Sequence, residues 1–200
     1  MGRKSNAPEK RKQIIWALYQ CLVEKGHEKV TIKEIASKAR VPPGVIHYYF
    51  TSKDEIVSSL TQAMVQKYSA MIQNHLKTKT STDDQIHHAI DFIIDKLIFN
   101  LPLNRVFYNL IQMAFERKEL QVVVKKIFTT YREQLAGVFR MAGAGKESQM
   151  LGASLFAVTE GFSLQLMVDP DAFKREDVSK FIEQAIQDRL RIKTDSKTSA

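Results

Sequence analysis

The segment TIKEIASKARVPPGVIHYYFTSK, from Thr31 to Lys53, constrains the fold more than any other part of this chain. Thr31 and Glu34 have the spacing of a capping box, in which each side chain bonds the backbone of the other at a helix start. Pro42 and Pro43 end the first short helix, and the fixed φ of proline suits the first turn of the next one. Because such a short second helix is not stable alone, other helices must hold it from behind. The pattern predicts a helix-turn-helix.

Basic residues gather in the part of the chain that carries this pattern. Residues 1–60 contain 11 Lys and Arg against 6 Asp and Glu, a net charge of +5, and the remaining residues add only +3. This excess is expected where a protein meets phosphate. The single cysteine, Cys21, excludes an intramolecular disulfide and suits a reducing cytoplasm. No cofactor is expected, because the chain has no recognisable glycine-rich phosphate loop or Ser-His-Asp pattern.

The rest of the chain has helical spacing and no convincing period-two alternation, so we expect an all-α fold of about nine helices. We divide it into a helix-turn-helix DNA-binding domain (1–52), a ligand-binding and dimerisation domain (53–193) and a disordered tail (194–200) that lacks apolar residues. Outside the helix-turn-helix, the expected helices cover residues 8–25, 52–77, 82–100, 102–115, 120–141, 147–168 and 175–191.

Two other patterns invite different interpretations. The run from Ser148 to Val168 has the length of a membrane span, but it contains Glu160, and a helix buried between its own core and a partner subunit explains it equally. His87 and His88 are adjacent on an expected helix and point about 100° apart, so they do not readily chelate one ion together. We therefore expect neither a membrane partner nor a metal.

The segment from Thr31 to Lys53 resembles the DNA-binding signature of the TetR (tetracycline-repressor) family of bacterial regulators. The matching residues are Thr31, Glu34-Ile35-Ala36, Ala39, Val41, Gly44, Tyr49-Phe50 and Lys53. Arg40 stands where the family usually has a glycine, and a left-handed turn there would cost about 1–2 kcal/mol relative to glycine. Pro42 replaces a preferred serine and His47 a preferred tyrosine. Residues 161–186 are modestly similar to the C-terminal end of betaine-type regulators.

In a helix-turn-helix, the second helix enters the major groove with its N-terminus first. The resemblance implies phosphate contacts at His47, Tyr49 and Lys53. Lys53 lies in the first turn of the next expected helix, where the helix dipole disfavours a positive charge, and a phosphate contact would explain a cation at this position. A plain surface turn is the alternative. The expected DNA-binding residues are Thr31, Pro43, Gly44, Val45, His47, Tyr48, Tyr49 and Lys53.

The resemblance also implies a ligand cavity between the helices of the larger domain. Core packing is the competing interpretation for each aromatic or methionine residue there, and Asn104, Asn109, Gln112 and Gln134 could orient a ligand. The candidate ligand-binding residues are Met64, Tyr68, Phe92, Phe107, Tyr108, Met113, Tyr131 and Phe162.

The last two expected helices carry a candidate dimer interface. Val178, Phe181, Ile182 and Ala185 form one apolar stripe, and Gly152, Ala157 and Gly161 give the preceding helix small residues that permit close approach. Two such helices from each subunit would make an isologous four-helix interface. The alternative is that both helices only cover their own core.

These features favour a cytoplasmic, ligand-responsive repressor that binds palindromic operator DNA as a homodimer and is released by a small, mainly apolar effector. An activator or an effector-independent regulator is the nearest alternative. An all-α enzyme that uses the central cavity is a different class, which the basic N-terminal third and the helix-turn-helix argue against.

Overall fold

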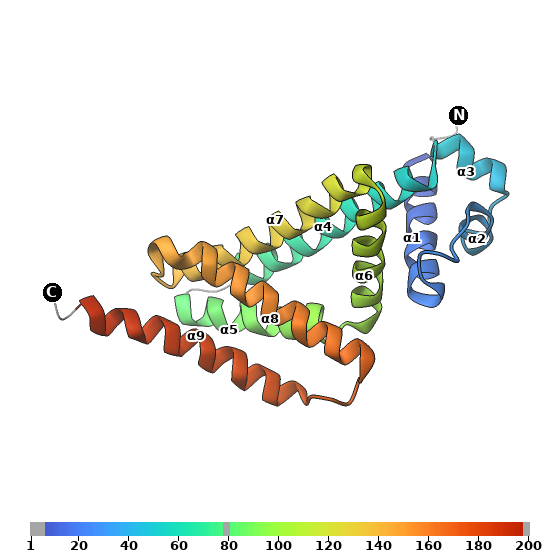
Figure 1. Cartoon of the computed structure of the whole chain (residues 1–200). Coiled ribbons are helices and arrows are strands. Elements are labelled where there is room, and N and C mark those ends of the chain that lie inside the picture. The colour runs from blue at the N-terminus through green and yellow to red at the C-terminus, as the bar shows by residue number, and fades with distance from the viewer. Residues whose placement is uncertain (1–6, 78–80, 198–200) are drawn as a thin grey trace. The chain divides into compact units, whose positions relative to one another are not determined.

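The computed structural model of the chain describes residues 7–77 and 81–197. Within these ranges every regular element is a helix (Figure 1), which confirms the all-α prediction. The α-helices are α1 (Ala7–Lys25), α2 (Ile32–Lys38), α3 (Pro43–Tyr49), α4 (Lys53–Lys77), α5 (Thr82–Ile93), α6 (Leu101–Glu116), α7 (Lys118–Met141), α8 (Ser148–Val168) and α9 (Arg175–Lys197). A π-helix, η1 (Ile94–Ile98), and a short 3-10 turn, η2 (Gly145–Glu147), complete the order.

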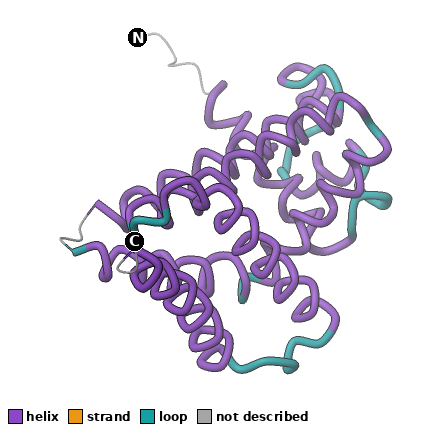
Figure 2. Tube along the Cα trace, turned by 60° about the vertical axis from the view of Figure 1, so that its left-hand side comes forward, coloured by secondary structure: helices purple, strands orange, loops and turns teal. Residues whose placement is uncertain are grey.

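The described residues form two compact units. The first contains the chain up to Gln66 together with Arg105–Ile127. In it, α1 packs against α2 and α3, and short loops join these three helices (Figure 2). The core of this three-helix reading head, as we call α1–α3, is made of large apolar side chains that are fully buried: Ile14, Leu18, Leu22, Ile35, Ile46 and Phe50.

The second unit contains Lys67–Asn104 and the chain from Phe128 onward. In it, α5 packs on α9, and η1 packs on both α8 and α9. Ile90, Ile93, Ile94 and Ile98 are fully buried at the centre of this packing. The boundary predicted at residues 52 and 53 stays a prediction, and the division between the two compact units at Gln66 and Lys67 falls within α4.

The helix expected over residues 82–100 ends as an α-helix at Ile93 and continues as η1. The backbone N–H of Phe99 donates at 3.0 Å to the carbonyl of Ile94, five residues earlier. This spacing is the hydrogen-bond pattern of a π-helix. The buried Asn104 side chain donates to the carbonyl of Ile98 at 2.9 Å. That amide therefore satisfies a backbone group at the distortion, instead of orienting a ligand.

The last helix is longer than the sequence predicts. It continues through Lys197, where the apolar pattern had indicated an end near Arg191. Residues 194–197 of the expected disordered tail are therefore helical, and residues 198–200 lie outside the described residues.

Candidate nucleic-acid interface and effector region

The capping box at the start of α2 is confirmed. The Glu34 N–H donates to Thr31 Oγ1 at 3.3 Å, and the Thr31 N–H donates to Glu34 Oε2 at 2.9 Å. The Lys25 ammonium lies 2.7 Å from Glu34 Oε1, and its hydrogen bond, followed by that of the Thr31 N–H, lowers the pKa of the Glu34 carboxyl. Thr31 is thereby fixed as the N-cap of α2, with its side chain exposed.

The turn after α2 has the left-handed geometry expected at Arg40, whose φ is 53°. The Arg40 N–H donates to the Ser37 carbonyl and the Val41 N–H to the Ala36 carbonyl, each at 3.0 Å. This pair of bonds is a Schellman motif, in which glycine is the usual residue at the left-handed position. An arginine therefore occupies a strained position directly before α3.

One face of α3 is open to solvent and the other is buried. Pro43 opens the helix, and Pro43, Gly44, His47 and Tyr48 are exposed, with 82% of Tyr48 accessible. Val45 and Tyr49 are half-buried. Ile46 and Phe50 are fully buried behind them. Four of the six expected DNA-contacting residues of this helix are thus on its accessible side.

An arginine of α1 holds α3 from behind, which the sequence pattern did not predict. The Arg11 guanidinium donates to the Tyr49 carbonyl, lies 3.0 Å from Glu55 Oε1 and stacks over the Phe50 ring at 4.0 Å from its centroid. The N–H of Thr51 and then Arg11 lower the pKa of Glu55. The contacts of Arg11 come from the end of α3 and from α4, 38 to 44 residues further along the chain, so no local spacing could have revealed them.

Lys53 has partners within the chain that the sequence did not predict. Its Nζ donates to the backbone carbonyls of Val30 at 2.6 Å and His27 at 3.1 Å, and the side chain is half-buried. Burial, with a contribution from Arg117, lowers the pKa of the Lys53 ammonium. The carbonyls give this cation a reason to stand at a helix N-terminus that involves no phosphate.

In the second unit, aromatic side chains of α7 and α8 meet. The Phe128 and Phe156 rings are 5.2 Å apart and nearly perpendicular, and Tyr131 lies 6.2 Å from Phe156. Burial raises the pKa of the Tyr131 hydroxyl, and Tyr68 and Glu160 add to this. Of the predicted ligand-binding residues, Tyr131 thus belongs to this aromatic group, and Tyr68 and Glu160 act on it electrostatically.

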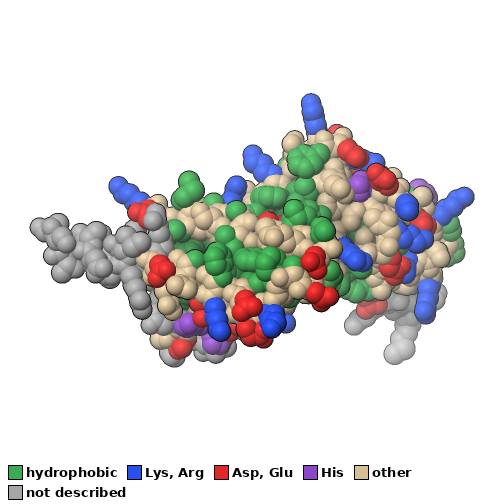
Figure 3. All heavy atoms as spheres, turned by 60° about the horizontal axis from the view of Figure 1, so that its bottom comes forward, with side chains coloured by type: hydrophobic (Ala, Val, Ile, Leu, Met, Phe, Trp, Pro, Cys, Tyr) green, Lys and Arg blue, Asp and Glu red, His purple; other side chains and the backbone are tan. Residues whose placement is uncertain are grey.

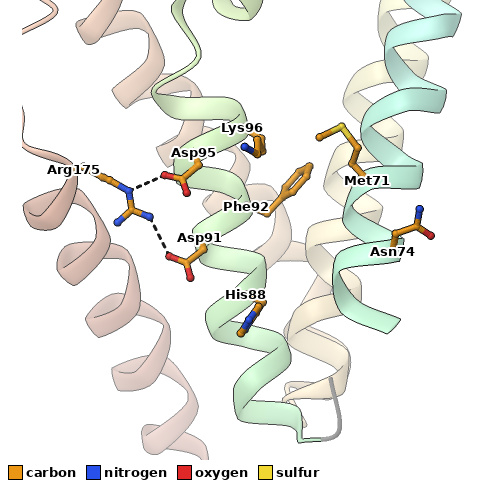
Figure 4. A pocket seen from close by; sticks show the side chains of 8 residues that line it. All are labelled: Met71, Asn74, His88, Asp91, Phe92, Asp95, Lys96 and Arg175. Carbon is orange, nitrogen blue, oxygen red and sulfur yellow. Dashed lines mark hydrogen bonds and ion pairs between the residues drawn. The ribbon is translucent and has the colours of Figure 1, made fainter. Parts of the chain in front are cut away.

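A cleft of about 700 Å³ opens between α4, α5, η1 and α9 (Figure 4). His88, Phe92 and Lys96 line it on the side toward Met71 and Asn74 of α4, while Asp91 and Asp95 point toward Arg175. Arg175 Nε lies 2.7 Å from Asp95 and its NH2 group 3.2 Å from Asp91. Of the predicted ligand-binding residues, Phe92 lines this cleft.

The other predicted ligand-binding residues have different surroundings. Met64, Phe107 and Met113 are buried and Tyr108 is half-buried, all within the first unit. Phe162 packs against Phe173 at 5.2 Å and Phe181 at 5.9 Å, which places it with the candidate dimer face.

That candidate face is partly internal. Val178 and Ile182 are buried, whereas Phe181 is 55% exposed and Ala157 and Ala185 are also exposed. Hydrophobic side chains form a band across the face that α8 and α9 carry (Figure 3). An apolar groove of about 230 Å³ lies between the two helices, with Val158, Phe181 and Ala185 in its lining.

Gly152 does not belong to this exposed surface. It is buried, and a Cβ there would meet the backbone of Ala136 and Arg132 in α7 of the same chain. Because glycine has no side chain, α8 can pack closely on α7 at this position. Gly161, by contrast, is half-exposed with open space around it.

The two alternative interpretations concern a metal site and a membrane span. His87 Nδ1 lies 3.9 Å from Glu183 and His88 Nδ1 2.8 Å from the Asp84 carbonyl, and no three His, Cys, Asp or Glu side chains of the described part form a metal-binding group. One described helix, Gly145–Val168, is long and apolar enough to cross a membrane by length and composition. A helix packed on its own core has the same composition.

The fold and the accessible face of α3 define a class, the helix-turn-helix proteins that regulate transcription. Residues 14–60 match the family of bacterial regulatory proteins called tetR, and residues 82–191 match the C-terminal region of BetI-type transcriptional repressors. The chain therefore belongs to the TetR family of transcriptional regulators, with a C-terminal region of the BetI type.

Similar proteins agree with this assignment. Nucleoid occlusion factor SlmA of Pasteurella multocida is 25% identical over 165 residues, covering 79% of this chain and 82% of the relative. A transcriptional regulator of Pseudomonas aeruginosa PAO1 has the same fold, with a TM-score of 0.80, 19% identity and coverage of 92% and 91%. The regulator FadR of Bacillus subtilis, solved with stearoyl-CoA, has a TM-score of 0.75, 19% identity and coverage of 88% and 96%.

Proposed function

We propose that this chain is a ligand-responsive repressor that binds palindromic operator DNA as a homodimer and is released by a small effector. The observation that carries the proposal is the accessible face of α3, where Pro43, Gly44, His47 and Tyr48 are exposed while Ile46 and Phe50 are buried. A helix held in this way presents its N-terminal residues to a major groove. Val45 and Pro43 are apolar, so their base contact is a thymine methyl group.

The homodimer is formed by α8 and α9. Exposed Phe181, Ala157 and Ala185 supply an apolar surface within the hydrophobic band of Figure 3, and buried interface centres favour an apolar composition. An isologous contact about a two-fold axis gives two reading heads related by the same axis, which matches a palindromic site.

The effector is mainly apolar and binds in the second unit. Tyr131 packs against Phe156 there, and a cleft of about 700 Å³ lies beside Phe92. FadR of Bacillus subtilis, a protein of the same fold, was solved with a long acyl thioester. Binding at this place favours a spacing of the two heads that fits DNA poorly, so effector and operator weaken one another by about 1–3 kcal/mol.

The proposal includes no catalytic role and places the protein in the cytoplasm, where operator DNA lies. Selection of bound fragments from a random DNA library tests the first part, with enrichment of a palindrome as the expected result. For the effector, a thermal-shift screen provides hits that are then titrated against a preformed operator complex. Hits that stabilise the protein but leave operator affinity unchanged would argue against release by effector.

A further inference from the structure

The connection between α1 and α2, residues 26–31, is held from the start of α4. Gly26 ends α1 with a φ of +76°, and the Val30 N–H donates weakly to the His27 carbonyl at 3.4 Å. Lys53 Nζ then bonds the carbonyls of both His27 and Val30. Val30 precedes Thr31, the N-cap of α2, so the ammonium fixes the point at which α2 begins.

The same connection is held on another side by α6. Asn109 Oδ1 accepts from the His27 N–H at 2.5 Å and lies 3.2 Å from the His27 ring Nδ1. The Asn109 amide nitrogen donates to the Arg105 carbonyl at 2.7 Å, which fixes the orientation of the amide. His27 is thus bonded through its N–H to α6 and through its carbonyl to α4.

The environment of Lys53 suits this internal role. The side chain is half-buried, and burial and the Arg117 guanidinium lower the pKa of its ammonium, against the opposite effect of Asp54 and Glu34. A partly desolvated ammonium needs hydrogen-bond acceptors, because an unpaired one is costly to bury. Two of its three protons are already donated to backbone carbonyls.

We propose that Lys53 is a positioning residue of the reading head: it acts with Asn109 on the α1–α2 connection to place α2 and α3 for the major groove. The inference rests on the proposed operator binding, and it gives Lys53 a role besides the phosphate contact that the resemblance implies. The Asp54–Arg117 ion pair beside it joins α4 to the residue that follows α6.

The dependence of operator affinity on salt distinguishes the two roles. A lost phosphate contact lowers the slope of log K against log salt by about 0.9, because one fewer counterion is released. Lys53→Met is expected to lower the operator affinity of the folded protein at least tenfold beyond what one missing phosphate contact explains, so that a deficit of about tenfold remains when the affinities are extrapolated to 1 M salt. Lys33→Met is the matched control, since it removes the same charge from an exposed position on α2, and it should leave the affinity within about threefold. A deficit that disappears in this extrapolation, or an unchanged affinity, would overturn the proposal.

A second variant tests the same connection from α6. Asn109→Leu should also weaken operator binding, here without changing the salt slope, whereas Gln121→Leu, on an exposed position of α7, should not. If the wild type binds no DNA, the proposed function fails. If it binds and Asn109→Leu binds equally well, only the present inference fails.

Discussion

Gly152 of α8 faces the backbone of Ala136 in α7 so closely that a Cβ on residue 152 would lie 2.5 Å from the Ala136 nitrogen. Gly152→Ala should therefore force the two helices apart and lower the free energy of unfolding by about 1–3 kcal/mol. Equilibrium unfolding in urea measures this. Gly161→Ala on the same helix is the control, since nothing lies within 4 Å of its Cβ position. This substitution should raise the free energy of unfolding by roughly 0.5–1 kcal/mol. Equal effects of the two substitutions would contradict the packing described.

The left-handed turn at Arg40 predicts how two substitutions at this position change the stability of the fold. Arg40→Gly relieves about 1–2 kcal/mol of left-handed strain and loses roughly 0.4–1 kcal/mol through the freer unfolded chain. The variant should therefore be as stable as the wild type or slightly more stable. Arg40→Val places a β-branched residue at a positive φ and should be clearly less stable. Urea unfolding compares the three proteins, and a valine variant of wild-type stability would show that the turn is not left-handed.

The ion pair between Arg175 and Asp95 predicts how stability changes in acid. Arg175 lowers the pKa of Asp95 below its ordinary value of 3.8. A carboxyl whose folded pKa lies below its unfolded pKa stabilises the fold above the unfolded value, and this contribution disappears as the pH falls through the folded value. Asp95→Asn should remove part of the loss of stability that the wild type shows below about pH 4. Thermal unfolding across this range tests it, with the exposed Asp171→Asn as a control. Identical pH profiles for the wild type and Asp95→Asn would exclude the pair.

Exposed Phe181 gives a test of the dimer. Phe181→Glu places a charge on the band of α8 and α9 and should give monomers in sedimentation at micromolar concentration, with helical content retained. Phe115 is a matched control, because it is 82% exposed in the first unit, and Phe115→Glu should remain dimeric. A monomeric wild type would rule out the interface.

Direct readout by the start of α3 predicts altered sequence preference. Substitution of Pro43 or Val45 by Ala should change the half-site chosen from a random DNA library, because a contact with a thymine methyl group is lost. The affinity for non-specific DNA should be unchanged. The same preferred half-site in both variants would remove these residues from base recognition.

The reading head could be predicted from the sequence because its signals are local. The capping box of Thr31 and Glu34 follows from spacing within one helical turn, and the turn at Arg40 follows from the resemblance to a family that usually has glycine there. The π-helix at Ile94–Ile98 could not, since its residues have ordinary helical spacing and the buried Asn104 that supports it lies on the next helix.

Long-range contacts account for the remaining differences. The dipole argument at Lys53 correctly required a partner for the cation, but the carbonyls of His27 and Val30 are 26 and 23 residues away. Gly152 has the spacing of an interface residue on α8, and only the structure shows that α7 of the same chain occupies that side. Periodicity identifies an apolar face without identifying which surface covers it.

Equilibrium binding to the DNA upstream of the protein's own gene tests the central claim most directly. Fluorescence anisotropy at physiological salt should compare this fragment with a scrambled fragment of the same length and composition. The account predicts one or more bound dimers on the upstream fragment, with an affinity at least about 10³-fold above that for the scrambled DNA. Equal affinity for the two fragments would contradict operator recognition by the accessible face of α3.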